Sequence, residues 1–237
     1  MRLARAVLAA VTVLAVSACT PSAPPPAPSP AVSTAPTAAS EIPEPTTTNT
    51  LPPPPAPTAA PASTAGRLSA ASLPVPAGWQ TKALPSSDED GTRSNGTWVH
   101  ERDARYAALD VITLGCADVT RDDFTDPTTA LEGNYVSADD EPGVGLVLDF
   151  ADEVAATRYF ALLQAQVQAC TTTDDPLRTT VVSNEADELI DQRTYADSQW
   201  IEVARRHGTA VTLIILSDPG HAFPQSAARA LLDQIGR

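Results

Sequence analysis

Residues 206–217 decide the fold, and they read Arg206-His207-Gly208-Thr209-Ala210-Val211-Thr212-Leu213-Ile214-Ile215-Leu216-Ser217. The first four residues predict a hairpin loop, and the rest predict a strand. This strand is apolar at nearly every position, so both of its faces need to be buried. We therefore expect it to lie near the centre of a sheet.

A second strand and a long helix precede this hairpin. From Val144 to Phe150 every second residue is large and apolar, which predicts a strand with one strongly apolar face. Asp152 and Glu153 then carry the negative charge that is favoured at the start of a helix. The helix is predicted to run to about Cys170, and its apolar residues recur every three or four positions. One stripe of this helix should pack on the sheet.

The other predicted elements alternate between strands and helices. Strands are expected at residues 97–101, 107–116, 178–182, 188–195 and 199–205, and helices at 127–132 and from Pro224 onwards. Residues 107–116 have apolar side chains on both faces, which is typical of an inner strand. Hairpins followed by single helices predict an α+β fold. We expect a single domain, mainly an antiparallel β-sheet with helices packed on one face.

The N-terminal part of the chain has a different composition. Arg2 and Arg5 precede an apolar stretch at 6–16 that is too short to span a bilayer, which indicates a secretion signal. The following Val16-Ser17-Ala18-Cys19 resembles the bacterial lipobox, in which the cysteine is acylated and becomes the mature N-terminus. This resemblance implies that Cys19 is a lipid anchor in the cell membrane, on its extracytoplasmic side. An ordinary secretion signal with an incidental cysteine is the alternative.

A proline-rich segment follows the predicted anchor. Of the 23 prolines, 15 lie between Thr20 and Gly66, among many alanines, serines and threonines. Such a composition buries too little apolar surface to fold and favours extended, solvated chain. The predicted organisation is a signal peptide at 1–18, a lipidated cysteine with a disordered Pro/Ala/Ser/Thr-rich linker at 19–66, and an α+β domain at 67–237.

Charge excludes one class of function. The chain carries 15 basic and 29 acidic residues, a formal net charge of −14, and Lys82 is its single lysine. Nucleic-acid binders carry a basic surface that displaces counterions from phosphates, so no nucleic-acid partner is expected. The acidic domain should also be repelled by anionic lipid headgroups.

The cysteine count points to a disulfide. If Cys19 is acylated, Cys116 and Cys170 are the two thiols left in an oxidising compartment. We expect them to form a disulfide between the end of one predicted element and the end of the main helix. A free core thiol at either position and a catalytic cysteine remain alternatives.

Known catalytic and cofactor motifs are absent from the sequence, and neither a metal nor a cofactor is expected. His100, His207 and His221 have no ligand spacing and are interpreted as solvated or structural. Residues 86–97 approach a calcium loop but lack its first carboxylate and its last glutamate. Two acidic groups, Asp118 with Asp122, Asp123 and Asp126, and Asp139-Asp140-Glu141, could bind a cation or a basic partner, although solvated loops are the favoured interpretation.

Tryptophans are the other candidate binding residues. Trp79, Trp98 and Trp200 could line a pocket for a ring or a sugar, whereas core packing is the commoner role. Trp79 follows Leu73-Pro74-Val75-Pro76-Ala77-Gly78 and is expected to pin the start of the domain. No individual ligand-binding residue is predicted.

A diffuse set of motifs resembles a known family. These are Gly115-Cys116-Ala117-Asp118, a strand ending at Phe150, a helix ending Gln168-Ala169-Cys170, Trp200, and a final strand from Arg205 to Val211. Together they resemble the extracellular sensor domain of mycobacterial PknH-type kinases, over roughly residues 73–237. That family has four cysteines and a tryptophan shortly before the helix-end cysteine, where this chain has Gln166 or Val167. The resemblance implies a sandwich with a cleft, a ligand-binding role and no catalysis, in a lipoprotein of an actinobacterium.

Three functions follow from these observations. The first is a membrane-anchored, non-catalytic module that binds a small molecule of the cell envelope. The second is a protein that docks on an envelope enzyme or secretion component through its acidic face. The third is a cell-wall hydrolase whose carboxylates are brought together only by the fold. An apolar cavity favours the first, a flat apolar patch the second, and two carboxyl groups facing a cleft the third.

Overall fold

The computed structural model describes residues 61–85, 95–172 and 176–236. All of them belong to one compact unit, Thr47–Arg237, and the other unit, Met1–Thr46, lies outside the described residues. The predicted signal peptide at 1–18, the predicted lipid anchor Cys19 and most of the predicted linker therefore lie outside them too. No helix among the described residues is long and apolar enough to cross a membrane.

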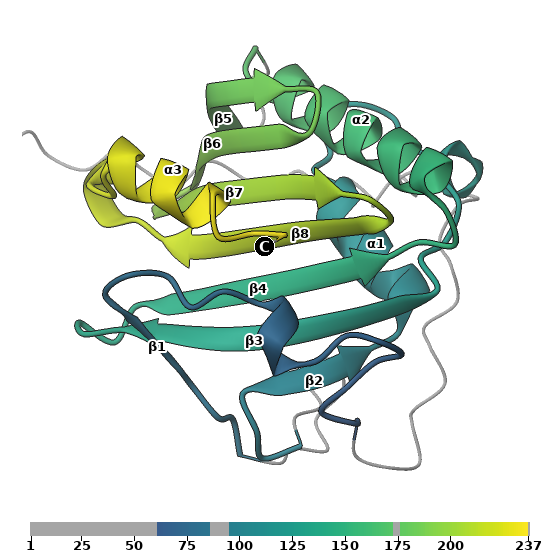
Figure 1. The fold of residues 1–237 in the computed structure, drawn as a ribbon. Helices are drawn as coiled ribbons and strands as arrows, with labels where there is room; N and C mark the ends of the chain where they lie inside the picture. Colours follow the sequence, from purple (N-terminus) through teal and green to yellow (C-terminus); the bar gives the residue numbers. More distant parts are fainter. Residues whose placement is uncertain (1–60, 86–94, 173–175, 237) are drawn as a thin grey trace, which may run out of the picture. The chain divides into compact units, whose positions relative to one another are not determined.

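The domain is built on an antiparallel sheet of eight strands with the order β1-β3-β4-β8-β7-β6-β5, and β2 also pairs with β3 (Figure 1). Strand β8 lies between β4 and β7, which confirms that the apolar strand after the hairpin is central. The strands are β1 Trp79–Thr81, β2 Val99–Arg102, β3 Thr129–Ser137, β4 Pro142–Asp149, β5 Leu177–Glu185, β6 Glu188–Tyr195, β7 Ser198–His207 and β8 Ala210–Ser217.

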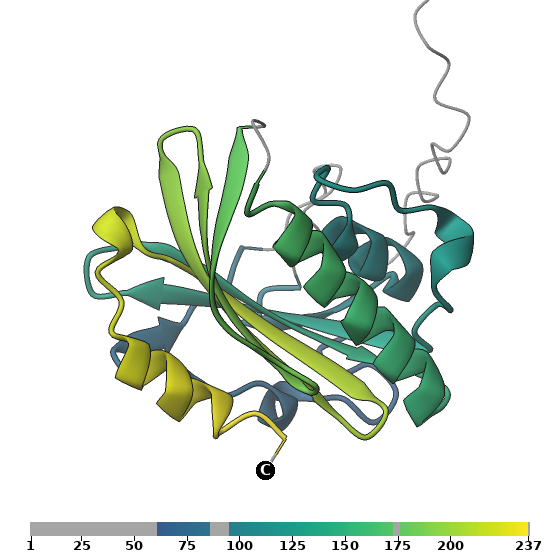
Figure 2. The ribbon, with the colours of Figure 1, turned by 90° about the horizontal axis from the view of Figure 1, so that it is seen from above.

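Helices cover both faces of this sheet. The helices are α1 Ala104–Ile112, α2 Glu153–Ala169 and α3 Gln225–Leu232, with short 3-10 turns η1 Ala70–Ser72, η2 Arg121–Asp123 and η3 Pro219–His221. Figure 2 shows α1 and α2 on one side of the sheet and α3 on the other. The α+β class and the antiparallel sheet are confirmed, but the prediction that all helices pack on one face is wrong for α3.

Helices cover both faces of the sheet because the side chains of β8 alternate between two apolar cores. Val211 and Leu213 join the core under α1 and α2, together with Tyr159 and Leu163 of α2. Ile214 and Leu216 point to the other face and join a second core with α3 and with residues 65–73. Because a strand with two apolar faces needs cover on each, one helical layer cannot satisfy it.

Residues 107–116 were expected as a strand, and this prediction is wrong. They contribute most of α1, which begins after the N-cap Asp103, whose side chain accepts a hydrogen bond from the Tyr106 amide at 3.1 Å. Ala107, Ala108 and Ile112 are its buried residues, a helical spacing that packs against α2. The capped, alanine-containing segment thus forms a helix where apolar residues on both faces had indicated a strand.

The helix expected at 127–132 is also wrong, because β3 begins at Thr129. Ala130 pairs with Leu148 and Gly133 with Gly145 in the ladder with β4. A Cβ atom at Gly145 would lie 2.7 Å from the Tyr135 hydroxyl, so the close approach requires glycine. Long-range pairing outweighs the local cap-and-proline pattern at residues 126–127.

The packed chain begins before Arg67, the predicted domain boundary. The Glu101 amide donates a hydrogen bond to the Ala62 carbonyl at 2.7 Å, and Ala65 is buried. The Tyr135 hydroxyl donates to the Pro74 carbonyl at 2.8 Å. These contacts fix the N-terminal segment across the α3 face of the sheet, so residues 62–66 belong to the fold.

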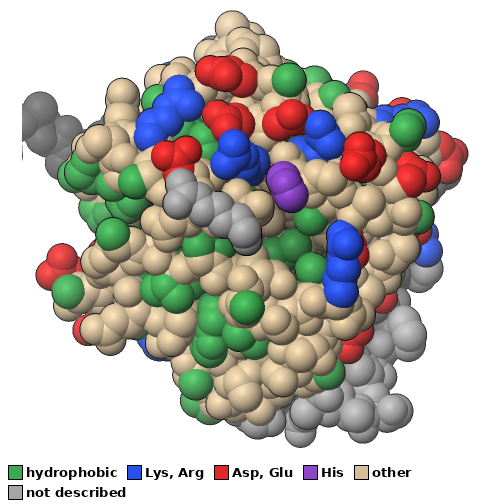
Figure 3. Space-filling view, in the orientation of Figure 1, with side chains coloured by type: hydrophobic (Ala, Val, Ile, Leu, Met, Phe, Trp, Pro, Cys, Tyr) green, Lys and Arg blue, Asp and Glu red, His purple; other side chains and the backbone are tan. Residues whose placement is uncertain are grey.

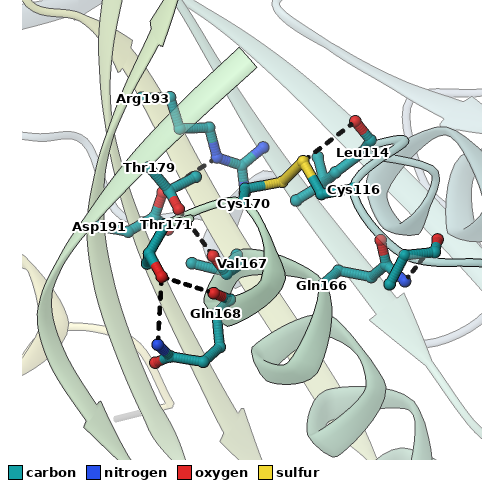
Figure 4. Close-up of a disulfide and its surroundings, with 11 residues drawn as sticks. Leu114, Cys116, Gln166, Val167, Gln168, Cys170, Thr171, Thr179, Asp191 and Arg193 are labelled. Atoms are coloured by element: carbon teal, nitrogen blue, oxygen red, sulfur yellow. Dashed lines mark hydrogen bonds and ion pairs between the residues drawn. A yellow bond between two sulfur atoms is a disulfide. The ribbon is translucent and has the colours of Figure 1, made fainter. Parts of the chain in front are cut away.

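A disulfide joins Cys116, in the loop after α1, to Cys170, which ends α2 (Figure 4). Hydrogen bonds reinforce this junction. The Gln166 side-chain amide donates to the Ala117 carbonyl at 3.1 Å, and the Thr179 hydroxyl donates to the Val167 carbonyl at 2.6 Å. The loop after α1, the end of α2 and strand β5 are thereby held together.

Replacing both cysteines by serine should lower the free energy of unfolding by about 4 kcal/mol, because the bridge closes a loop with a sequence separation of 54. Urea unfolding of the double variant measures this loss. Unfolding the wild-type chain in the presence of a reductant is the control, and it should show the same loss. Unchanged midpoints in both experiments would contradict a stabilising bridge.

Candidate functional site

A cleft of about 260 Å³ lies between α1 and the sheet, and we call it the α1 cleft. Its floor consists of apolar strand residues and its wall comes from α1, with Trp200 and four charged residues completing the lining. The floor residues are Val144, Leu146, Leu213 and Ile215, the wall residues are Ala107 and Val111, and the charged residues are Arg102, Asp110, Glu132 and Arg193.

Strand register explains this grouping. Leu146 of β4 pairs with Leu213 of β8, and Val144 pairs with Ile215. Positions two apart on a strand share a face, so these four side chains form one apolar surface. Helix α1 covers only part of this surface, and the remainder is the floor of the cleft.

One end of the α1 cleft is closed by an ion-pair cluster around Arg102. Its guanidinium lies 3.0 Å from an Asp110 carboxylate oxygen and also contacts Glu132. His100 Nε2 lies 3.5 Å from the other Glu132 oxygen. Burial lowers the pKa of His100, and Arg102 adds to this effect while Glu132 opposes it. At neutral pH this end holds one cation and two carboxylates.

The other end holds a buried trio, Asp191, Arg193 and Glu202. Arg193 Nε donates to Asp191 Oδ1 at 3.1 Å, and its Nη2 lies 2.6 Å from Glu202 Oε2. Both carboxyl side chains are 0% exposed, whereas Arg193 keeps 10% of its surface and lines the cleft. Asp191 and Glu202 are direct register partners across β6 and β7, which places two acidic groups side by side.

This arrangement raises the pKa of both carboxyl groups. Burial raises the pKa of Glu202 to about 8, with Arg193 lowering it and Asp191 raising it further. Burial also raises the pKa of Asp191, against the effect of Arg193. At neutral pH Glu202 is therefore mainly protonated. The trio then holds at most one carboxylate beside its guanidinium.

The carboxylates that face the α1 cleft are not arranged for acid–base catalysis. Asp110 and Glu132 both pair with Arg102, and the two acids of the trio have no exposed surface. A glycosidase needs one carboxyl group free to donate a proton and another facing the substrate. Across the described ranges, no group of three histidine, cysteine or acidic side chains could hold a metal ion.

A second cleft of about 330 Å³ lies on the opposite face, between the N-terminal segment and the residues that follow α3. Its lining is more polar and includes Arg67, His207, Thr212 and Gln234. Arg67 already pairs with Asp149 at 2.6 Å. Figure 3 shows this face of the molecule, on which acidic and basic side chains are mixed in the upper half and apolar ones are scattered below.

The three histidines do not meet. His100 lies on β2 beside Glu132, and His207 lies at the end of β7 in the second cleft. His221 Nε2 lies 3.0 Å from the Thr194 hydroxyl, and its Nδ1 lies 3.6 Å from Asp218. Each therefore has its own surroundings, consistent with structural or solvated roles.

The acidic loops have mainly local roles. Asp123 accepts hydrogen bonds from the Thr120 amide and hydroxyl, which lower the pKa of its carboxyl. Glu141 accepts a hydrogen bond from Ser217, and Asp139 and Asp140 are exposed. Most of the candidate calcium loop, residues 86–94, lies outside the described residues.

Of the three tryptophans, Trp200 alone lines the α1 cleft. Trp79 and Trp98 lie on the other face, where a Cβ atom at Gly143 would come within 2.9 Å of Trp79 and one at Gly133 within 2.8 Å of Trp98. Those two rings fill the space above glycines and serve the core. Arg193 and its carboxylate partners were not predicted, because Asp191 and Arg193 lie in a run of four polar residues, 191–194, that gives no sign of a buried face.

Comparison with solved structures gives remote likenesses. The extracellular domain of PknH from Mycobacterium tuberculosis is similar in structure, with 11% sequence identity and a TM-score of 0.36, over 73% of this chain and 85% of that chain. No protein-family model matches the chain, and no curated protein matches it. What the chain's own fold and geometry define is an α+β domain with a small, largely apolar cleft.

The raised pKa of Glu202 predicts a pH-dependent stability. The folded chain holds this proton up to about pH 8, and an ordinary glutamate loses it near 4.5, so the free energy of unfolding should fall as the pH rises between these values. The slope is at most about 1.4 kcal/mol per pH unit. Urea unfolding of Glu202→Gln across pH 5 to 9 should show a flatter profile than the wild type.

The exposed Glu185→Gln on β5 is the matched control and should retain the wild-type profile. Parallel profiles for wild type and Glu202→Gln would contradict a proton held at Glu202.

Proposed function

We propose that this protein is a non-catalytic, extracytoplasmic binding module that holds a small, mainly apolar molecule of the cell envelope in the α1 cleft. The observation that carries this proposal is the α1 cleft itself, in which an apolar floor, a helical wall and Trp200 surround about 260 Å³. Sites for small molecules are typically concave and mainly apolar, with a few polar groups that set orientation.

The volume limits the size of the ligand. An engineered apolar cavity of about 150 Å³ accommodates benzene, with its six heavy atoms. In proportion, the α1 cleft fits a molecule of about ten heavy atoms. This is small for a binding site and favours a short chain or a single ring.

Two observations favour a binding module over the other functions. The carboxylates facing the α1 cleft are both paired with Arg102, which leaves no free acid for a hydrolase. The large apolar side chains exposed on the described surface are Val75, Val154 and Tyr195, which lie on separate segments. A flat apolar patch, the usual mark of a docking surface, is missing from that part of the chain.

The proposed location is the outer face of the cell membrane, with Cys19 as the lipid anchor. The disulfide between Cys116 and Cys170 is consistent with an oxidising, extracytoplasmic compartment. The proline-rich segment after Cys19 would act as a spacer. Several acyl chains on one cysteine would hold the protein stably, since one chain binds only reversibly.

Filling the α1 cleft should weaken ligand binding. Val111→Trp places a large ring at the wall, so binding of octan-1-ol, a neutral probe of suitable size, should weaken at least about fivefold. Calorimetric titration measures binding. Val154→Trp, at a helix position that is 78% exposed, is the control and should bind as the wild type does. Equal binding by all three proteins would place the ligand elsewhere.

Removing the proposed anchor should release the protein from the membrane. In a bacterial expression host, Cys19→Ser should lose the incorporation of radiolabelled palmitate and move from the membrane fraction to the soluble or secreted fraction. Ser22→Ala, three residues further on, should behave as the wild type does. A Cys19→Ser protein that still carries the label would contradict the assignment of the acylated residue.

A further inference from the structure

We propose that the ligand of the α1 cleft is a small apolar monocarboxylate whose carboxylate binds Arg193. This inference rests on the proposed function of the same cleft and specifies its chemistry. It follows from three features of the cleft. The guanidinium groups of Arg102 and Arg193 can only donate hydrogen bonds, the acids beside Arg102 carry more negative charge than those beside Arg193, and the floor between the two arginines is apolar.

The guanidinium groups select a ligand that accepts hydrogen bonds. Arginine carries donors and no acceptor, so a ligand end facing it must supply acceptor oxygens. Arg193 uses Nε for Asp191 and directs Nη2 at Glu202. Its side chain is 10% exposed and lines the α1 cleft. A carboxylate oxygen is the acceptor that forms the strongest, charge-assisted hydrogen bond with a guanidinium. An ammonium group has donors only and offers Arg193 no acceptor.

The charges at the two ends of the cleft favour binding of the ligand's carboxylate at Arg193 and not at Arg102. Arg102 already contacts both Asp110 and Glu132, so that end carries an excess of negative charge and repels an anion. Arg193 faces two acids as well, but Glu202 is protonated at neutral pH. The Arg193 end is therefore the less negative of the two.

The apolar part of the ligand would pack on the floor of the cleft. Trp200 is the register partner of Arg193, and Ile215, Val144 and Leu146 continue the surface toward α1. Neighbouring strands lie about 4.8 Å apart, so the four spacings from β6 to β3 amount to about 19 Å. An extended chain of about eight carbons fits within this span with its carboxylate at Arg193.

Binding should be coupled to the proton on Glu202. When Glu202 ionises, it competes with the ligand for Arg193 and adds a negative charge beside Asp191. The neighbouring groups do not relieve this charge. Tyr159 of α2 is a neutral phenol whose pKa is raised by burial and by Glu202, and Asp110 on α1 is a further acid. A bound carboxylate therefore favours the protonated form of Glu202.

The experiment compares three probes of one length with the purified full-length protein. Octanoate, octanamide and octylamine share the apolar chain and differ in the head group. Calorimetric titration at pH 7 should show octanoate binding at least about tenfold more tightly than either of the others, as expected for a charge-assisted contact. At pH 9 octanoate should bind about tenfold more weakly than at pH 7, given a Glu202 pKa near 8.

Two variants isolate the role of Glu202. In Glu202→Gln no ionisation competes, so the affinity for octanoate should be the same at pH 7 and pH 9. Glu185→Gln, an exposed change of the same kind on β5, should keep the pH dependence of the wild type. A retained pH dependence in Glu202→Gln would overturn the coupling.

The outcomes separate this inference from the proposed function. If octanamide or octylamine binds as tightly as octanoate, the α1 cleft binds apolar molecules without selecting a carboxylate, and the inference fails while the proposed function stands. If neither octan-1-ol nor any of the three probes binds, both fail. If octanoate binds equally well to Val111→Trp, it occupies another site and the inference is overturned.

Discussion

Burial of β8 on both of its faces is the constraint on which the rest of this structure depends. Its side chains alternate between two cores, so the sheet needs cover on each side. The layer of α1 and α2 is held by the bridge between Cys116 and Cys170. Because α1 has only nine residues, it leaves part of the apolar floor uncovered, and the α1 cleft is that uncovered part.

The buried trio is the least expected feature of the domain. Two carboxyl groups and a guanidinium lose their hydration on burial, and replacing such a group by apolar residues often leaves a fold equally stable or makes it more stable. Placing Asp191 opposite Glu202 adds repulsion, which is relieved when one of them keeps its proton. A structural core alone gives no reason for this arrangement. Presentation of Arg193 to a ligand provides one.

Much of the fold was predictable from the sequence, and the failures have physical reasons. Between Val144 and Ser217 the strands and α2 lie close to their predicted bounds. Residues 107–116 were assigned wrongly because a short segment that is apolar on several sides fits a strand or a buried helix equally well. The cap at Asp103 and the packing against α2 decided for the helix. The helix predicted at 127–132 is wrong because the pairing of β3 with β4 joins residues that are distant in sequence, and a local pattern does not show such pairing.

The candidate site was predictable only in part. Trp200 stood out as a rare aromatic residue, but nothing in the sequence separated it from Trp79 and Trp98, which fill the other core. Arg193 and Glu202 resemble the solvated residues of an ordinary strand until the register of β6 and β7 buries them together.

Chemical-shift mapping by NMR tests most directly whether ligands bind between α1 and the sheet. Titration of the isotopically labelled protein with octanoate at pH 7 should move the resonances of Trp200, Val111 and the facing positions of β4 and β8 most strongly. If the largest changes fall instead around Arg67, His207 and Gln234 in the second cleft, or if no resonance moves, the account is wrong.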